Sequence, residues 1–306
     1  MQNSEAQTTN GATTPVFQGS IVALVTPFRD GRVDEPALEA LIEWHLQAGT
    51  DGFVPVGTTG ESPTLSHDEH RRVVELTIAT VAGRAPVIAG AGSNSTTEAI
   101  ALTQHAKEVG ADAALVVTPY YNKPTQAGLY AHYKAINDAV DIPVIIYNIP
   151  PRSVIDMLPP TMAKLAELPN IVGVKDACND IVRPLEMRAR LGAAFCQLSG
   201  EDANIVGFLA HGGHGCISVT ANVAPALSAA MHDAWNAGDH AEALRINQRL
   251  LPLHQALFCE SSPAPTKYAL SRLGRCTAEV RLPLVQIASE SKTKVDAALR
   301  AVELLD

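Results

Sequence analysis

The stretch ALVVTPYYNKPTQAGLYAHYKAINDAVDIPVIIYN, residues 114–148, decides the fold. Two short apolar runs rich in β-branched residues, 114–120 and 143–148, lie at its two ends. A longer segment that mixes apolar and polar residues separates them, as expected for a helix that covers a sheet. Because both runs are almost continuously apolar, we expect each strand to be buried on both faces. The stretch therefore predicts a βα unit of a parallel sheet.

The same unit recurs along the chain, at intervals of about 20–35 residues. A GxGxxG fingerprint does not follow the first run, which argues against a dinucleotide-binding fold. Eight units in series then favour a closed (β/α)₈ barrel, the TIM barrel, over a large open sheet. The eight predicted strands are Ile21–Pro27, Gly52–Gly57, Pro86–Gly92, Ala114–Tyr120, Pro143–Asn148, Ile171–Ala177, Phe195–Gly200 and Gly215–Asn222.

The chain after the eighth strand carries helical patterns but no further βα unit. The first of these helices completes the barrel and the other three form a C-terminal helical extension. We expect a flexible N-terminal arm over residues 1–15, the barrel over 16–238 and the extension over 239–306. The four predicted helices are 224–237, 240–258, 265–273 and 290–305.

Helix-start signals support the segments between the strands. Asp34 precedes Pro36 at the start of the first helical pattern. Ser66 with Glu69, and Ser95 with Glu98, each match the capping-box spacing, in which a hydroxyl and a carboxylate cap the first turn.

The composition excludes several classes of protein. The 306 residues carry a formal net charge of −9 and no Lys/Arg-rich run, so we expect no nucleic-acid partner. No apolar run reaches the roughly 18–20 residues that span a bilayer, and the N-terminus lacks the features of a secretory signal. The five cysteines are far apart in the sequence and form no CxxC pair. These features predict a cytoplasmic protein without disulfides or a metal site.

Chemically useful side chains follow the predicted strands. In barrels of this kind the active site lies at the C-terminal ends of the strands. Hydroxyls, phenols, one lysine and one arginine gather at those ends, whereas metal-ligand clusters do not. The residues concerned are Thr58, Thr59, Tyr120, Tyr121, Tyr147, Arg152, Lys175, Gly200, Glu201 and Ser218.

Lys175 is the most informative of these residues. Strand alternation places Ile171, Gly173 and Lys175 on one face, pointing into the barrel, and Val172 and Val174 on the other. An apolar interior favours the neutral amine, which is the form that attacks a carbonyl. A lysine paired with Asp176 or another acid is the alternative. The missing side chain of Gly173 favours the first interpretation, since it leaves room for a small ligand.

The other candidates also have ordinary structural interpretations. The loop Gly57–Ser62 has two glycines and three hydroxyls, so its backbone amides suit a carboxylate or phosphate, but such a loop can equally be a plain tight turn. Tyr120, Tyr121 and Tyr147 can relay protons or only pack with a hydrogen-bonded tip. Arg152 can grip a carboxylate with two hydrogen bonds or lie on the surface.

Taken together, these residues resemble the dihydrodipicolinate synthase family of class I aldolases, within the N-acetylneuraminate-lyase-like group. The matching stretches run in order from the second strand to the eighth, so the resemblance covers nearly the whole barrel. They are GTTGESPTL from Gly57, VVTPYYNKPTQAGLY from Val116, YNIPPR from Tyr147, GVKDA from Gly173, SGED from Ser199 and GGHGCISVTAN from Gly212.

The resemblance implies a reaction and a set of catalytic residues. Lys175 is expected to condense with pyruvate to an imine and then an enamine, which attacks the aldehyde of L-aspartate 4-semialdehyde. The product would be 4-hydroxy-tetrahydrodipicolinate, an intermediate of lysine and diaminopimelate biosynthesis. Thr58, Tyr121 and Tyr147 look like the family's proton relay. Tyr121 is expected to reach into the site of a neighbouring subunit, which implies a dimer and, by resemblance, a homotetramer formed as a dimer of dimers.

It also implies how the substrates are held. Thr59 would bind the pyruvate carboxylate and Arg152 the carboxylate of the semialdehyde. Gly200 and Ile217 resemble the family's backbone contacts that line the site. No cofactor or metal is expected, because the lysine supplies the electron sink.

Two features discriminate within the superfamily. Sialic acid lyases resemble the chain in the lysine strand but typically have GSTGE where this chain has GTTGE, and they lack an arginine like Arg152, as sugar-acid dehydratases and aldolases tend to. These enzymes remain alternatives, as does a non-catalytic barrel that binds small carboxylates. A phosphate-handling isomerase is disfavoured because no clear Gly-rich phosphate loop lies near strands seven and eight.

Inhibition by L-lysine is a further implication of the resemblance. Lysine-inhibited members bind L-lysine at the dimer interface, and a carboxylate such as Glu98 beside an aromatic ring such as Tyr120 suits a cationic amino acid. Pro63 departs from the alanine common in sensitive members, and Glu98 has its alternative role as a helix cap. The matching positions are Ser62, His67, His70, Asn94, Glu98 and Tyr120.

Overall fold

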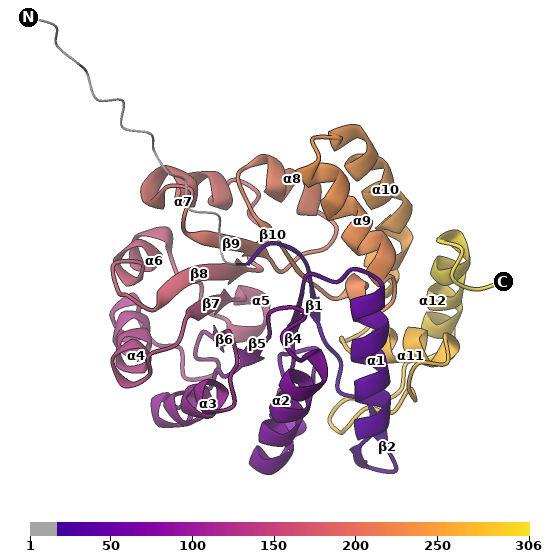
Figure 1. Ribbon diagram of the computed structural model, residues 1–306, viewed down its shortest axis with the longest axis horizontal. Coiled ribbons are helices and arrows are strands. Elements are labelled where there is room, and N and C mark those ends of the chain that lie inside the picture. Colours follow the sequence, from indigo (N-terminus) through magenta and orange to yellow (C-terminus); the bar gives the residue numbers. More distant parts are fainter. Residues whose placement is uncertain (1–16) are drawn as a thin grey trace, which may run out of the picture.

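The computed structural model describes residues 17–306, so the predicted N-terminal arm lies outside the described residues. Its centre is one sheet of eight parallel strands that curls into a barrel (Figure 1). All eight strands were predicted, and each is shorter than expected. They are β1 (Gly19–Ala23), β4 (Gly52–Val54), β5 (Ile88–Gly90), β6 (Ala113–Val117), β7 (Val144–Asn148), β8 (Ile171–Asp176), β9 (Cys196–Ser199) and β10 (Gly215–Ser218).

The strands follow one another around the barrel in chain order. β1 pairs in parallel with both β4 and β10, and the other strands pair in sequence from β5 to β10. An isolated parallel bridge between Phe53 and Val87 joins β4 to β5 and closes the circle. The predicted (β/α)₈ architecture is therefore confirmed.

Helices surround the barrel and connect its strands (Figure 1). All three start signals precede a helix, and at two of the three helices the predicted capping hydrogen bonds form. Asp34 accepts a hydrogen bond from the Ala37 amide, and Ser66 and Glu69 form the full capping box. The helices up to β10 are α1 (Glu35–Gln47), α2 (His67–Val81), α3 (Thr96–Glu108), α4 (Gln126–Ala139), α5 (Pro150–Ser153), α6 (Pro159–Leu165), α7 (Arg183–Leu191) and α8 (Ile205–Ala210), with a 3₁₀ turn at Ser62–Thr64.

The predicted capping box at α3 is wrong. The Ser95 side chain makes no capping hydrogen bond. Glu98 turns instead toward the Ser93 hydroxyl, which donates to its Oε2, and toward His67, whose Nε2 lies 2.9 Å from its Oε1. The carboxylate therefore joins α3 to the start of α2 rather than capping its own helix.

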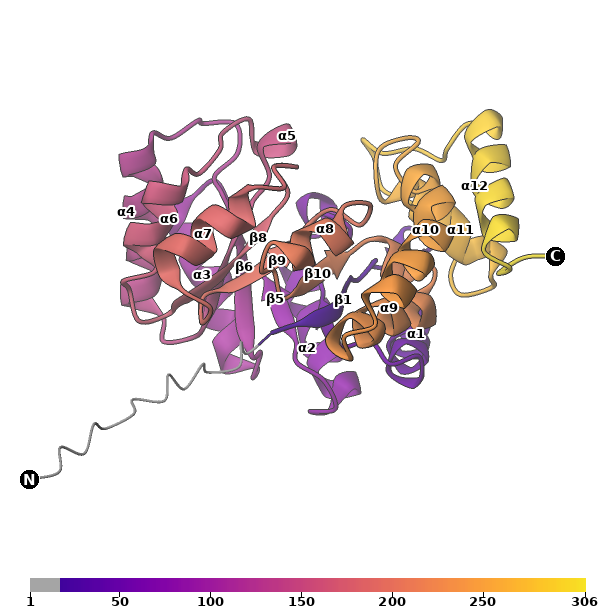
Figure 2. The same ribbon diagram turned by 90° about the horizontal axis from the view of Figure 1, so that it is seen from above.

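The last quarter of the chain is helical, as predicted. Figure 2 shows α9 against the barrel beside α1, with α10, α11 and α12 gathered to one side of it. A two-stranded hairpin, β2 (Phe28–Arg29) with β3 (Arg32–Val33), follows the first barrel strand and was not predicted. Within residues 17–306, no helix has the length and apolar character needed to cross a membrane. The four helices are α9 (Pro225–Asn236), α10 (His240–Ala256), α11 (Ala264–Arg272) and α12 (Ser289–Ala301).

Apolar side chains form two cores, as strands covered on both faces require. An inner cluster fills the barrel and includes Ile21, Leu115 and Ile217. A larger outer cluster lies between the strands and the helices and continues into the extension. Because the barrel interior is packed, a ligand site is expected at its rim, where the strands end.

The strand β8 departs from simple alternation at its start. Its register against β7 shifts between Val144 and Ile145, so Ile171 packs in the outer cluster and Val172 against the inner one. The predicted faces of these two residues are therefore wrong. Alternation is regular after this bulge, and Lys175 points inward as expected.

The strand β10 ends earlier than predicted because the carboxylate of Asp202 binds the residues that follow it. Asp202 accepts hydrogen bonds from the amides of Val219 and Thr220 and from the Ser218 hydroxyl. These bonds turn the chain into a 3₁₀ helix, η2 (Thr220–Asn222), where the sequence predicted strand.

Candidate active site

Lys175 stands at the C-terminal end of β8, between Tyr147 of β7 and Leu198 of β9 in register. Its side chain is 6% exposed, and its Nζ lies 4.2 Å from the centre of the Tyr147 ring. No carboxylate of residues 17–306 lies within 4 Å of this nitrogen, and Asp176 pairs with Arg183 instead, at 3.6 Å. The alternative of a lysine held in an ion pair is therefore not what the structure shows.

The space around this lysine comes from Gly200 rather than from Gly173. A Cβ on Gly173 would lie 2.5 Å from the carbonyl oxygen of Cys196, so that glycine admits the neighbouring strand. The inference that it makes room for a ligand was wrong. A Cβ on Gly200, by contrast, would lie 3.2 Å from Cε of Lys175. Gly200 is thus the residue that leaves the lysine chain its room.

A charged network that the sequence did not reveal supports the ends of β7 and β8. Arg183 at the start of α7 binds both oxygens of Asp156, at 2.7 and 2.8 Å, and faces Asp176. Asn148, the last residue of β7, donates to Asp156 and accepts from the Met157 amide. The spacing of these residues in the sequence gives no sign of the network. It is recognised only from the contacts that Arg183 makes with Asp156 and Asp176 in the folded chain.

Two acids follow β9 on the other side of the lysine. Burial raises the pKa of Glu201, the neighbouring charge of Asp202 raises it further, and the Lys175 charge opposes both. The net effect is a pKa of Glu201 above its ordinary value. Asp202 is fully engaged in holding the end of β10, as described above.

The loop after β4 presents Thr58 and Thr59. The amides of Gly60, Glu61 and Ser62 all donate to carbonyls of Gly57 or Thr58 within the turn. Those amides are therefore committed, whereas the Thr58 and Thr59 amides donate to no acceptor among residues 17–306. Of the loop amides predicted to bind an anion, only those of Thr58 and Thr59 are therefore available to do so.

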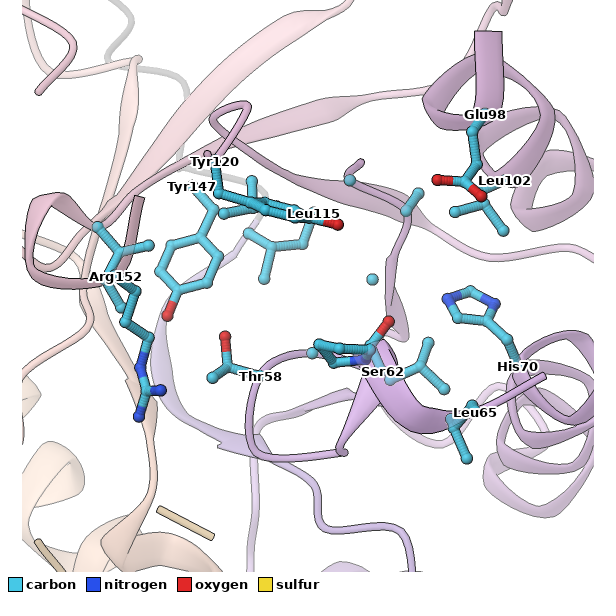
Figure 3. A pocket seen from close by; sticks show the side chains of 18 of the residues that line it. Thr58, Ser62, Leu65, His70, Glu98, Leu102, Leu115, Tyr120, Tyr147 and Arg152 are labelled. Carbon is cyan, nitrogen blue, oxygen red and sulfur yellow. The ribbon is translucent and has the colours of Figure 1, made fainter. Parts of the chain in front are cut away.

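A pocket of about 460 Å³ opens at this rim. Figure 3 shows Tyr147, Thr58 and Arg152 grouped at one end, with the phenol oxygen and the threonine hydroxyl turned toward one another. Arg152 comes from the short helix α5 and is exposed. Two of the three residues predicted for the proton relay, Thr58 and Tyr147, therefore line one pocket together with Arg152.

The same pocket extends to the residues predicted for an inhibitor. Ser62 lies midway, and His70 and Glu98 lie at the far end (Figure 3). Burial, followed by the charge of His105, lowers the pKa of His70 to about 4, so the ring is neutral at neutral pH. In this single chain the two predicted sites form one continuous space, whose lining also includes Pro63, His67 and Tyr120.

Six of the predicted residues, Lys175 among them, are not part of that lining. Tyr121 is 87% exposed and has a left-handed backbone, with φ of 72°. Asn94 instead holds the turn that carries it, donating to the Tyr120 carbonyl while Asn122 donates to the Asn94 carbonyl. Ile217 is fully buried in the inner cluster. The six are Lys175, Thr59, Tyr121, Asn94, Gly200 and Ile217.

Known proteins resemble this chain over nearly its whole length. The 4-hydroxy-tetrahydrodipicolinate synthase of Rhodospirillum centenum is 64% identical over 290 residues, which are 95% of this chain and 100% of that protein. A dihydrodipicolinate synthase structure from Acinetobacter baumannii, described as chloride inhibited and complexed with pyruvate, superposes with a TM-score of 0.92 at 47% identity, covering 94% of this chain and 99% of that one.

A third relative comes from Cyanidioschyzon merolae. Its dihydrodipicolinate synthase, described with lysine bound, gives a TM-score of 0.92 at 39% identity and covers 95% of this chain and 100% of that one. The model of the dihydrodipicolinate synthetase family matches residues 16–302. This chain belongs to the dihydrodipicolinate synthetase family.

Proposed function

We propose that this chain condenses pyruvate with L-aspartate 4-semialdehyde to 4-hydroxy-tetrahydrodipicolinate, a step of lysine and diaminopimelate biosynthesis, through a Schiff base on Lys175. Relatives about 60% identical carry the name of this synthase, which makes the chain a lyase. The observation that carries the assignment of Lys175 is its position. It is a buried amine at the end of a barrel strand, beside a phenol and within 4 Å of no carboxylate of residues 17–306.

The reaction begins with a neutral amine. Lys175 Nζ attacks the keto carbon of pyruvate, and loss of water leaves an imine. The methyl carbon then gives up a proton, and the resulting enamine attacks the aldehyde carbon of the semialdehyde. The amino group of the semialdehyde closes the ring onto the imine carbon and displaces Lys175, which returns as the free amine.

Proton transfer in these steps falls to hydroxyl groups. Tyr147 and Thr58 both line the pocket, and Figure 3 shows their hydroxyl groups turned toward one another, as a proton relay between them requires. Tyr121 supplies the third hydroxyl from a neighbouring subunit, which accounts for its exposure and its left-handed backbone in a single chain. A dimer is then the smallest active unit, and a dimer of dimers is the proposed assembly.

Carboxylates of the two substrates are held separately. The Thr58 and Thr59 amides and the Thr59 hydroxyl bind pyruvate, because they have no partner within the described chain. Arg152 binds the semialdehyde, since its exposed guanidinium stands at the mouth of the pocket beside Tyr147. Gly200 and Ile217 line the lysine through their backbones.

Lysine inhibition is a second proposal, favoured by the far end of the pocket. An amino acid with a cationic side chain suits Glu98 and the Tyr120 ring, and neutral His70 adds no repulsion. The relative from Cyanidioschyzon merolae is described with lysine bound. Calorimetry with millimolar L-lysine tests the idea. We expect heat of binding and lost activity with L-lysine and neither with D-lysine, and silence with both contradicts it.

Trapping the imine tests the main proposal. Borohydride added with pyruvate should leave a permanent mass increase on Lys175, and Lys175→Ala should lose it. An unmodified Lys175 despite bound pyruvate would point to a barrel that only binds carboxylates. A coupled assay with aspartate semialdehyde, run beside N-acetylneuraminate cleavage, separates the proposed substrate from that of the sialic acid lyases.

A further inference from the structure

A buried ion pair joins the loop of Thr58 and Thr59 to the C-terminal extension. Lys267 of α11 and Glu61 of the loop are 0% and 1% exposed at their side chains, and Nζ lies 2.5 Å from Oε1. Two charges so deeply buried are stable only when both are satisfied. Lys267 also donates to the Glu279 carbonyl and lies 3.8 Å from the centre of the Phe28 ring.

The second oxygen of the Glu61 carboxylate is held by the same extension. The Arg281 amide donates to it at 3.0 Å. The Arg281 guanidinium continues past the loop, donating to the Thr64 carbonyl and to both oxygens of Glu69 at the start of α2. We call the group formed by Lys267, Arg281 and Glu61 the extension clamp. It fixes the loop from the side of the C-terminal extension.

The clamp acts on a residue whose backbone is strained. Glu61 has φ of 56°, a left-handed conformation that costs energy for any residue other than glycine and persists where surrounding contacts enforce it. Its amide donates to the Thr58 carbonyl, so its conformation sets the turn that carries Thr58 and Thr59. On the barrel side, the Thr26 hydroxyl donates to the Gly60 carbonyl, so the loop is bound from both sides.

We propose that Lys267 is a positioning residue for the reaction: acting through Glu61, it sets the orientation in which Thr58 and Thr59 meet pyruvate. This inference rests on the proposed function of the loop. It gives the C-terminal extension a part in catalysis although the extension supplies no group that touches the substrate. Misplacement of a reacting group by about 1 Å costs on the order of a hundredfold in rate.

Lys267→Met keeps an unbranched side chain one atom shorter than lysine and removes its charge. We expect the imine to form still on Lys175 at saturating pyruvate, because that residue lies on a different element. The pyruvate KM should rise about tenfold, through Thr59, and kcat should fall about tenfold, through Thr58. Tyr268→Phe is the matched control. It is the next residue of α11, its hydroxyl binds Asp296 of α12, and its loss should leave both constants within twofold of the original.

A folding defect must be separated from a misplaced loop. Lys267→Met leaves the Glu61 charge buried alone, whereas Glu61→Gln with Lys267→Met removes both charges and should restore much of the melting temperature. The kinetics are measured on whichever variant is folded at the assay temperature. A pyruvate KM raised more than twofold supports the proposal, and constants within twofold of the original overturn it. Absence of a pyruvate adduct in the unmodified protein would instead defeat the proposed function itself.

Discussion

Gly200 is so close to Lys175 that a Cβ atom at this position would contact the lysine side chain. Gly200→Ala would place a Cβ 3.2 Å from Cε of Lys175 and 2.7 Å from Cβ of Ala177, so the amine must shift. We expect the rate of borohydride trapping with pyruvate to fall by about tenfold or more. Gly173→Ala is the comparison, because its Cβ meets strand backbone rather than the lysine. Gly173→Ala should mainly lower the melting temperature. If both substitutions slowed borohydride trapping equally, the assignment of Gly200 to the lysine and of Gly173 to strand packing would be wrong.

Arg152 is predicted to serve only the second substrate. Arg152→Ala removes a charge-assisted hydrogen-bond pair, so we expect kcat/KM for the semialdehyde to fall about 10- to 100-fold. Formation of the pyruvate imine should be unaffected. Arg71→Ala, on the exposed face of α2, is the control. Equal damage to imine formation and to aldehyde use would mean that the arginine has another role.

At the scale of elements, the ion pair between Glu69 and Arg281 ties the start of α2 to the extension. Hydrogen bonds from Arg281 lower the pKa of Glu69 to about 2, against the effect of burial. Because the folded pKa lies below the ordinary value of 4.5, this pair stabilises the fold fully above pH 4.5. The contribution is lost as the pH falls toward 2.

Urea unfolding at several pH values checks this expectation. Between pH 5.5 and 3, the free energy of unfolding should fall less steeply for Glu69→Gln than for the unmodified chain. Glu43→Gln, which breaks an exposed pair with Arg84, should change the slope little. A Glu69→Gln slope identical to the original would show that the pair does not couple to folding.

The sequence predicted elements better than it predicted contacts between them. Eight strands and the inward lysine follow from hydrophobic runs and alternation, which are local properties. The faces of Ile171 and Val172 were wrong because the register against a neighbouring strand introduces a bulge. The Glu98 cap was wrong because Ser93 and His67 compete for its carboxylate. The extension clamp joins residues about 200 positions apart, and no local pattern marks it.

At the scale of the whole molecule, the exposed Tyr121 predicts that one chain completes the site of another. Tyr121→Phe should lower kcat by about 10²–10⁴, since positioned acid–base groups contribute that much. Two inactive variants should then rescue each other. Tyr121→Phe mixed with Lys175→Ala and refolded together should regain about a quarter of the activity, because half the pairs are mixed and each has one complete site.

Refolding each variant alone is the control, and neither should regain activity. If Tyr121 served the site of its own chain, no mixture would recover, because each chain would carry its own defect. The melting curve of Tyr121→Phe should match that of the unmodified protein, since the variant keeps the ring and loses only its hydroxyl.

The circular order of the strands also bears on how the chain is made. β1 lies between β4 and β10, and because β10 is synthesised about 200 residues later, Gly19 must wait for Gly215 before the two can pair. Glu61 waits longer still, for a partner 220 positions later, which at ordinary rates of synthesis is about 10–40 s. A message broken within the codons just before Arg281 would therefore yield a protein that has every barrel strand and Lys267 but lacks the Arg281 groups that hold Glu61 and Glu69.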